Sequence, residues 1–174
     1  MTRNNLINET DFDAVLRCSH PRYRKIFILL AETGYRLEDL LHLRIWQAEK
    51  ATTSGVLALT EAKTGKHREV LISALAKTIF RGLITPKKSK LSYLFPTLRL
   101  VEKKKRHRST VSRQFHDAVA RAGLSEKGYT VHSLRKLYAR RLYESGKTVT
   151  EVQKDLNHEY TSTTLLYLSD LRMR

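Results

Sequence analysis

Along most of this chain the apolar positions recur with the three-to-four-residue spacing of α-helices. An apolar stripe behind Thr10 predicts a first helix that begins there, because threonine is a good N-cap. A second helix is predicted from Pro21, which suits a first helical position, to Gly34, which suits a helix end. Leucines with helical spacing after Arg36 predict a third helix. Further helices are expected over residues 74–83, 109–122, 132–144, 149–156 and 163–168.

Two short apolar segments, residues 55–60 and 69–72, favour β-strands instead. They flank Lys63-Thr64-Gly65-Lys66, whose glycine and polar side chains are typical of a tight turn. We therefore predict an α+β fold that is mainly helical, with one small antiparallel β-sheet. Because no repeat, low-complexity segment or clear linker interrupts the pattern, we expect residues 1–174 to form a single domain.

The charge of the chain points to a nucleic-acid partner. There are 33 Lys and Arg residues against 17 Asp and Glu, a net charge of +16. Such an excess suits a polyanion, because Lys and Arg displace the counterions condensed on DNA or RNA. On charge alone, a ribosomal or histone-like binder or a merely basic surface fits as well. The residues expected to contact DNA are Lys66, Lys103, Lys104, Lys105, Arg106, Arg108 and Arg113.

Other features of the sequence indicate the cellular setting. The single cysteine, Cys18, cannot form an internal disulfide, which suits a reducing compartment. No stretch reaches the roughly 18 apolar residues of a membrane span, and no apolar signal-peptide core follows Met1. We expect a cytoplasmic, nucleoid-associated protein. Neither metal-ligand spacing nor a phosphate-binding glycine loop is present, so no cofactor is expected.

Four short segments carry the candidate chemistry. In chain order they are Thr33-Gly34-Tyr35-Arg36 with Asp39 behind it, Lys63 in the hairpin turn, His132-Ser133-Leu134-Arg135, and Leu156-Asn157-His158 followed by Tyr167, nine residues beyond His158. Each alone is a common pattern, but the four in this order resemble the motif boxes of the tyrosine recombinase, or phage integrase, family. The resemblance extends from about Thr10 to the end of the chain. It implies the catalytic-domain fold of that family, with Asn157 in place of the usual glycine.

The resemblance implies that the chain cuts and rejoins DNA through a 3′-phosphotyrosine on Tyr167. Arg36 and Arg135 would bind the phosphate oxygens, a role that suits planar, permanently charged guanidinium groups. Because a phenol has an ordinary pKa of about 10, a base must help to remove its proton, and the family pattern offers His132. Tyr160, the rival nucleophile, has the wrong spacing from the preceding histidine.

Two further residues complete the implied catalytic set. Lys63 would be the general acid that protonates the leaving 5′-oxygen. Lys66 is the alternative, because the sequence does not place the side chains of a flexible turn. His158 would hydrogen-bond the scissile phosphate and help to orient the tyrosine. We expect Asp39 to be structural, either orienting Arg36 or capping a nearby turn.

The implied activity is site-specific recombination of double-stranded DNA without metal or nucleotide. Complete exchange would require a homotetramer on DNA, with a monomer as the free form. The alternatives are type IB topoisomerase-like relaxation and a non-catalytic DNA-binding regulator of the same fold, although a regulator would place no demand on Tyr167 or His132. Family members usually carry a helical core-binding domain before the catalytic domain. We expect that domain to be absent here, in an excised domain or a naturally minimal recombinase.

Overall fold

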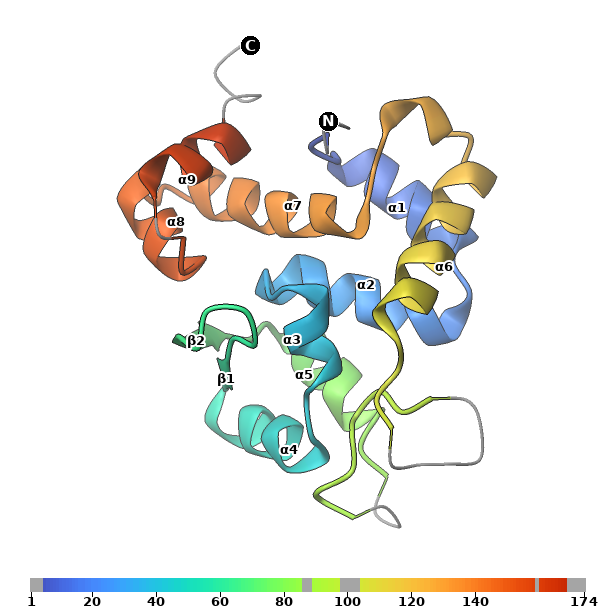
Figure 1. Ribbon diagram of the computed structural model, residues 1–174, viewed down its shortest axis with the longest axis vertical. Helices are drawn as coiled ribbons and strands as arrows, with labels where there is room; N and C mark the ends of the chain where they lie inside the picture. The colour runs from blue at the N-terminus through green and yellow to red at the C-terminus, as the bar shows by residue number, and fades with distance from the viewer. Residues whose placement is uncertain (1–4, 86–88, 98–103, 159, 169–174) are drawn as a thin grey trace. The chain divides into compact units, whose positions relative to one another are not determined.

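The computed structural model describes residues 5–85, 89–97, 104–158 and 160–168 (Figure 1). The chain forms two compact units, the first of residues 1–35 and 112–174 and the second of residues 36–111. It passes from one unit to the other after Tyr35 and again inside one continuous helix. Because neither passage is a loop of linker composition, the hydrophobic pattern gives no sign of this division.

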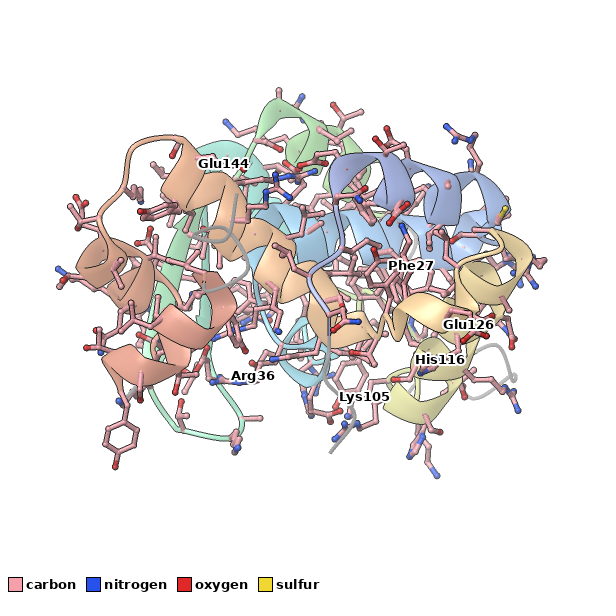
Figure 2. The ribbon with its side chains drawn as sticks, turned by 90° about the horizontal axis from the view of Figure 1, so that it is seen from above. Phe27, Arg36, Lys105, His116, Glu126 and Glu144 are labelled. Atoms are coloured by element: carbon pink, nitrogen blue, oxygen red, sulfur yellow. The ribbon has the colours of Figure 1, made fainter. Side chains whose placement is uncertain are left out.

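The first unit is helical in its described residues. Its elements are α1 (Glu9–Cys18), α2 (Pro21–Thr33), most of α6 (Arg108–Arg121), the short 3₁₀ helix η1 (Ser125–Lys127), α7 (Val131–Glu144), α8 (Val149–Asp155) and α9 (Thr161–Leu168). Helix α2 packs against α7, and α8 and α9 pack against each other and against α7. Phe27 of α2, labelled in Figure 2, meets Phe115 of α6 edge-on, with ring centroids 5.0 Å apart. This buried aromatic pair joins elements that are distant in the sequence.

The ends of the first two helices follow the capping rules, with one correction. Helix α2 begins at Pro21, and Gly34 ends it in the left-handed conformation with a φ of 61°, as predicted. Helix α1, however, begins before Thr10. Asn8 is its N-cap, and its side-chain oxygen accepts a hydrogen bond from the backbone N–H of Asp11 at 2.7 Å. Asparagine and threonine are both good caps, and here the earlier residue caps the helix.

The second unit contains the hairpin. Its elements are α3 (Leu37–Leu41), α4 (Ile45–Ser54), β1 (Val56–Thr60), β2 (His67–Leu71) and α5 (Ala74–Arg81). The strands pair antiparallel, with Val56 opposite Leu71 and Thr60 opposite His67, which confirms the predicted hairpin. Strand β2 starts two residues earlier than expected. Its first inward position is Arg68, a buried arginine where an apolar residue would have signalled a strand.

Helix α4 was not predicted from the sequence. Its buried residues are Ile45, Ala48 and Ala51, so two of its three inward positions are alanines. Trp46, its largest apolar residue, is 42% exposed. Alanine has the best intrinsic helix propensity, but its small side chain contributes little to the periodicity of hydrophobic positions. The sequence pattern therefore did not indicate this helix.

Candidate active site

The predicted nucleophile, Tyr167, lies in α9 and is only 6% exposed. It belongs to a buried cluster with Ala139 of α7, Val152 of α8 and Leu156, which follows α8. The tyrosine hydroxyl is hydrogen-bonded to Nε2 of His132 in α7. Packing therefore fixes the ring, while its oxygen is held against an imidazole that can act as a base.

Nitrogen-bearing side chains surround the Tyr167 ring. The imidazole of His132 meets it edge-on with centroids 5.5 Å apart, and that of His158 does so at 4.8 Å. The ammonium nitrogen of Lys136, one helical turn after His132, lies 5.5 Å from the ring centroid. Two imidazoles and one ammonium group therefore lie around the ring that carries the predicted nucleophile.

The start of α7 places His132 through a capping box. The hydroxyl of Thr130 accepts a hydrogen bond from the backbone N–H of His132 at 3.2 Å. The backbone N–H of Thr130 in turn donates to the hydroxyl of Ser133 at 3.1 Å. Such reciprocal bonds satisfy donors that a helix start leaves unpaired. His132 and Arg135 then share a face because they are three residues apart on one helix.

His158 is held by the loop between α8 and α9. Asn157 adopts the left-handed conformation with a φ of 51°, which confirms the expectation that asparagine replaces glycine at this helix end. The Nδ1 atom of His158 lies 2.9 Å from the hydroxyl oxygen of Thr164, a buried residue of α9. Helix α9, which carries Tyr167, therefore also orients this histidine.

Arg135 is almost fully buried, with 2% of the residue exposed. Its Nη1 donates to the carbonyl of Gly34 at 2.7 Å, and its Nη2 donates to the carbonyl of Leu156. The guanidinium thereby ties α7 to the end of α2 and to the end of α8. The sequence indicated only a phosphate-binding role, but the structure gives this arginine a structural role as well.

Replacing Gly34 by alanine should lower the free energy of unfolding by about 3 kcal/mol, from backbone strain and overpacking combined. Gly34 has a φ of 61°, and a Cβ atom added there would lie 2.7 Å from Cγ of Tyr138. Urea denaturation followed by circular dichroism measures the loss. Gly123→Ala is the matched control, because Gly123 has a φ of 72° with open space around the added atom. It should lose only about 1 kcal/mol from strain. Equal losses at both glycines would contradict the role of the Tyr138 contact.

Arg36 belongs to the second unit and occupies the N-cap position of α3. Its side chain makes no capping hydrogen bond to that helix. Its Nη1 forms an ion pair with Oε2 of Glu61, a carboxylate that is fully buried. Asp39 is the structural residue that we expected, because its Oδ1 accepts the backbone N–H of Ala62 at 2.8 Å. Sequence reasoning missed Glu61. The available signal was a charged residue directly after an apolar strand.

Lys63 and Lys66 both lie in the exposed turn between β1 and β2. Gly65 closes this turn in the left-handed conformation, with a φ of 67°. The carbonyl of Lys66 accepts the backbone N–H of Glu61 at 3.0 Å. Lys63 is thus at the centre of the turn and Lys66 at its end. Both residues are exposed to solvent, so the choice between them as general acid stays a prediction.

The residues expected to bind DNA fall into different environments. Lys104, Arg108 and Arg113 are exposed, as contact with a phosphate backbone requires. Lys103 lies outside the described residues. Contact with DNA therefore stays a prediction for the three exposed residues, and the structure does not test it for Lys103.

Lys105 and Arg106 are engaged within the second unit. Lys105, labelled in Figure 2, forms an ion pair with Glu38, and this hydrogen bond holds the pKa of the Glu38 carboxyl below its usual range. Arg106 is buried, and its Nε and Nη2 donate to the carbonyl of Pro96 at 3.4 and 3.3 Å. The structure thus gives Arg106 a role within the second unit, and its contact with DNA stays a prediction. The sequence shows a run of basic residues here, but it does not indicate that the side chain of one of them points into the protein.

Two further observations concern the described part of the chain. No group of three or more His, Cys, Asp or Glu side chains is arranged there to hold a metal ion. None of its helices combines the length and the apolar character needed to cross a bilayer.

Comparison with known proteins agrees with the motif boxes. The profile of the phage integrase family matches residues 4–173. YoeC of Bacillus subtilis, a probable integrase/recombinase, is 32% identical over 144 residues, which are 82% of this chain and 75% of YoeC. The tyrosine recombinase XerD of Brucella suis is 28% identical over 158 residues, which are 88% of this chain and 50% of XerD. The chain thus spans about half the length of this second relative.

Solved structures show the same fold. The crystal structure of XerA recombinase superposes with a TM-score of 0.79 at 24% identity, covering 97% of this chain and 61% of that chain. A lambda integrase dimer bound to a COC′ core site gives a TM-score of 0.72 at 23% identity, covering 94% and 60%. The mainly helical fold with a small antiparallel sheet is confirmed by these likenesses. With the family profile matched over nearly its whole length, the chain belongs to the phage integrase family of tyrosine recombinases.

Proposed function

We propose that this chain cleaves and rejoins DNA strands through a covalent bond to Tyr167, as the catalytic part of site-specific recombination. The observation that carries the proposal is the hydrogen bond between the Tyr167 hydroxyl and Nε2 of His132. A packed tyrosine whose oxygen meets an imidazole nitrogen has the arrangement of a nucleophile and its base. The relatives described above are named as recombinases or integrases, which favours strand exchange over DNA relaxation or simple binding.

Cleavage would transfer a DNA phosphoryl group from one oxygen to another. His132 accepts the phenol proton, the Tyr167 oxygen bonds to phosphorus, and the bond from phosphorus to the 5′-oxygen breaks. Lys63 supplies the proton that this leaving oxygen needs. The 3′-phosphotyrosine retains the energy of the broken ester, so a 5′-hydroxyl of another strand can attack it in the reverse step. Rejoining therefore requires no nucleotide.

The positive side chains would stabilise the transition state, in which the non-bridging oxygens carry additional negative charge. Arg36 and Arg135 are the proposed donors, and fixed donors of this kind act most strongly where water is excluded. His158, oriented through Nδ1 by Thr164, would bind the phosphate through its other ring nitrogen. Arg135 would then serve both the phosphate and the backbone carbonyls that it bridges.

Double-stranded DNA is the proposed substrate, and the excess of 33 basic over 17 acidic residues supports it. Lys66, Lys104, Arg108 and Arg113 are the exposed residues that we assign to its backbone. A full exchange joins two duplexes with four strand cleavages, so we propose a homotetramer on DNA and a monomer when free. A protein with this substrate would act at the nucleoid.

A nicked-duplex trap tests the proposed function even though the target sequence is not specified in advance. A library of duplexes with random sequence around the nick is incubated with the chain. Cleavage near the nick releases a short oligonucleotide, so rejoining fails and the covalent adduct accumulates. We expect a protein–DNA species that survives denaturing electrophoresis, and its DNA, once sequenced, gives the target. A folded chain that binds the library and forms no such species would contradict the proposal.

Lys63→Met should slow cleavage of the recovered substrate by about 100-fold or more, because it removes the proposed general acid. A substrate with sulfur in place of the leaving 5′-oxygen should restore most of the rate, since a thiolate leaves without protonation. Lys66→Met is the matched control in the same turn, and it should weaken DNA binding more than cleavage. If Lys66→Met instead shows the large loss and the sulfur rescue, Lys66 is the acid.

A further inference from the structure

Glu61 stands out among the charged groups of the second unit that the proposed reaction does not use. It follows β1 directly and is fully buried. One of its carboxylate oxygens, Oε2, forms the ion pair with Nη1 of Arg36 and also accepts a hydrogen bond from the Thr64 hydroxyl at 2.9 Å. Thr64 is the next residue after Lys63. A single oxygen atom therefore links the proposed phosphate-binding arginine to the turn that carries the proposed acid.

The backbone of Glu61 closes the same turn. Its N–H donates to the carbonyl of Lys66 at 3.0 Å, and its carbonyl accepts the N–H of Gly65 at 2.8 Å. The next N–H, of Ala62, is bound by the Asp39 carboxylate at 2.8 Å. Side chain and backbone together thus fasten the turn to the start of α3, the helix that Arg36 precedes.

Desolvating a carboxylate is expensive, so its burial requires partners that compensate the charge. Arg36 supplies the opposite charge, and Thr64 supplies a further donor. In return the carboxylate restricts the many rotamers of the Arg36 side chain to one direction. Transition-state stabilisation depends on donors that are fixed before the reaction, so the direction of the guanidinium matters as much as its charge.

From this geometry we infer that Glu61 is a positioning residue for strand cleavage, setting both the Arg36 guanidinium and the turn that carries Lys63. The inference rests on the proposed function, because it acts through the two residues assigned there. Glu61 itself exchanges no proton and touches no DNA. Its effect should appear in the rate of cleavage and not in the affinity for DNA.

Glu61→Gln tests the inference with the least change in shape. The amide keeps the size of the side chain and one acceptor oxygen but removes the charge that holds Arg36. We expect single-turnover cleavage to fall by about 30-fold, since small misplacements of catalytic groups reach losses of about 100-fold. The dissociation constant for DNA should stay within about twofold of the unaltered chain, as expected where transition-state interactions alone are lost. Glu69→Gln is the matched control, an exposed glutamate on β2 of the same hairpin, and both quantities should stay unchanged.

Two measurements separate positioning from general destabilisation. The sulfur-containing substrate needs no acid. On this substrate, Glu61→Gln alone should slow cleavage. The double variant with Arg36→Ala should cleave as fast as Arg36→Ala alone, since both changes then remove the same interaction. Thr64→Val removes one hydrogen bond from the turn without touching the charge pair. It should slow cleavage by about fivefold on the ordinary substrate, the worth of one hydrogen bond, and not at all on the sulfur substrate.

Additive losses in the double variant, or normal cleavage by Glu61→Gln, would overturn the inference. If Glu61→Gln does not fold, Thr64→Val decides: equal rates to the unaltered chain on the ordinary substrate would overturn it. These outcomes differ from failure of the proposed function, in which the unaltered chain itself forms no covalent adduct.

Discussion

Replacing Tyr167 by phenylalanine should abolish the covalent protein–DNA adduct, a loss of about 10,000-fold or more in cleavage. The change removes only the hydroxyl oxygen, which is the proposed nucleophile. The ring stays buried with its cluster, and the change removes the hydrogen bond to His132. That bond is worth about 1 kcal/mol, and the chain should remain folded and bind DNA with nearly unchanged affinity. Denaturing electrophoresis of the nicked-substrate reaction measures the adduct, and a gel-shift titration measures the binding.

Tyr160→Phe is the matched control for this experiment. Tyr160 lies seven residues before Tyr167 and is 64% exposed, with no buried packing to lose. The adduct should form at the normal rate in this variant. An adduct that persists in Tyr167→Phe and disappears in Tyr160→Phe would reverse the assignment of the nucleophile.

Replacing Arg135 by alanine should lower the free energy of unfolding by about 3–5 kcal/mol, because it strips a donor from two buried carbonyls and leaves a cavity. Gly34 and Leu156, whose carbonyls it bridges, lie at the ends of two different helices. Urea denaturation measures the loss. Arg140→Ala, on the same helix, is the control. Arg140 pairs with Glu144 one turn away at the surface, an interaction worth about 0.3–0.5 kcal/mol.

Arg135→Lys separates the structural role of this residue from the catalytic one. Lysine keeps the positive charge but lacks the planar fork that reaches two acceptors at once. We expect a smaller loss of stability than in Arg135→Ala and a fall in cleavage of about 100-fold or more, the usual effect of removing one transition-state donor. An Arg135→Ala chain with unchanged unfolding would contradict the bridging role. A fully active Arg135→Lys chain would contradict the role in phosphate binding.

The parts of the site that the sequence predicts are those set by local rules. His132 and Arg135 share a face because a helix places residues three apart on one side. The left-handed ends at Gly34 and Asn157 follow from the residue types that tolerate positive φ. The hairpin turn follows from its glycine and polar residues. Each of these depends on only a few neighbouring positions in the chain.

The parts that the sequence does not show depend on distant contacts. Glu61 pairs with Arg36 across 25 residues, and Arg135 reaches the Gly34 carbonyl across 101. Arg106 turns inward to bind the carbonyl of Pro96, although its neighbours are basic and several of them are exposed. Such contacts depend on how the chain folds back on itself, and they leave no periodic signal. For this reason the sequence indicated a phosphate-binding role for Arg135 and gave no sign of its bonds to two backbone carbonyls.

Tyr167 is identified as the nucleophile most directly by finding which residue carries the DNA in the covalent adduct. The adduct formed by the unaltered chain on the nicked substrate is digested with nuclease and trypsin and examined by mass spectrometry. Cleavage after Lys154 and Arg172 gives a peptide of residues 155–172 that contains both Tyr160 and Tyr167. We expect a nucleotide phosphate on this peptide, with fragment ions that place it at Tyr167. A nucleotide on Tyr160 or on any residue outside this peptide would contradict it.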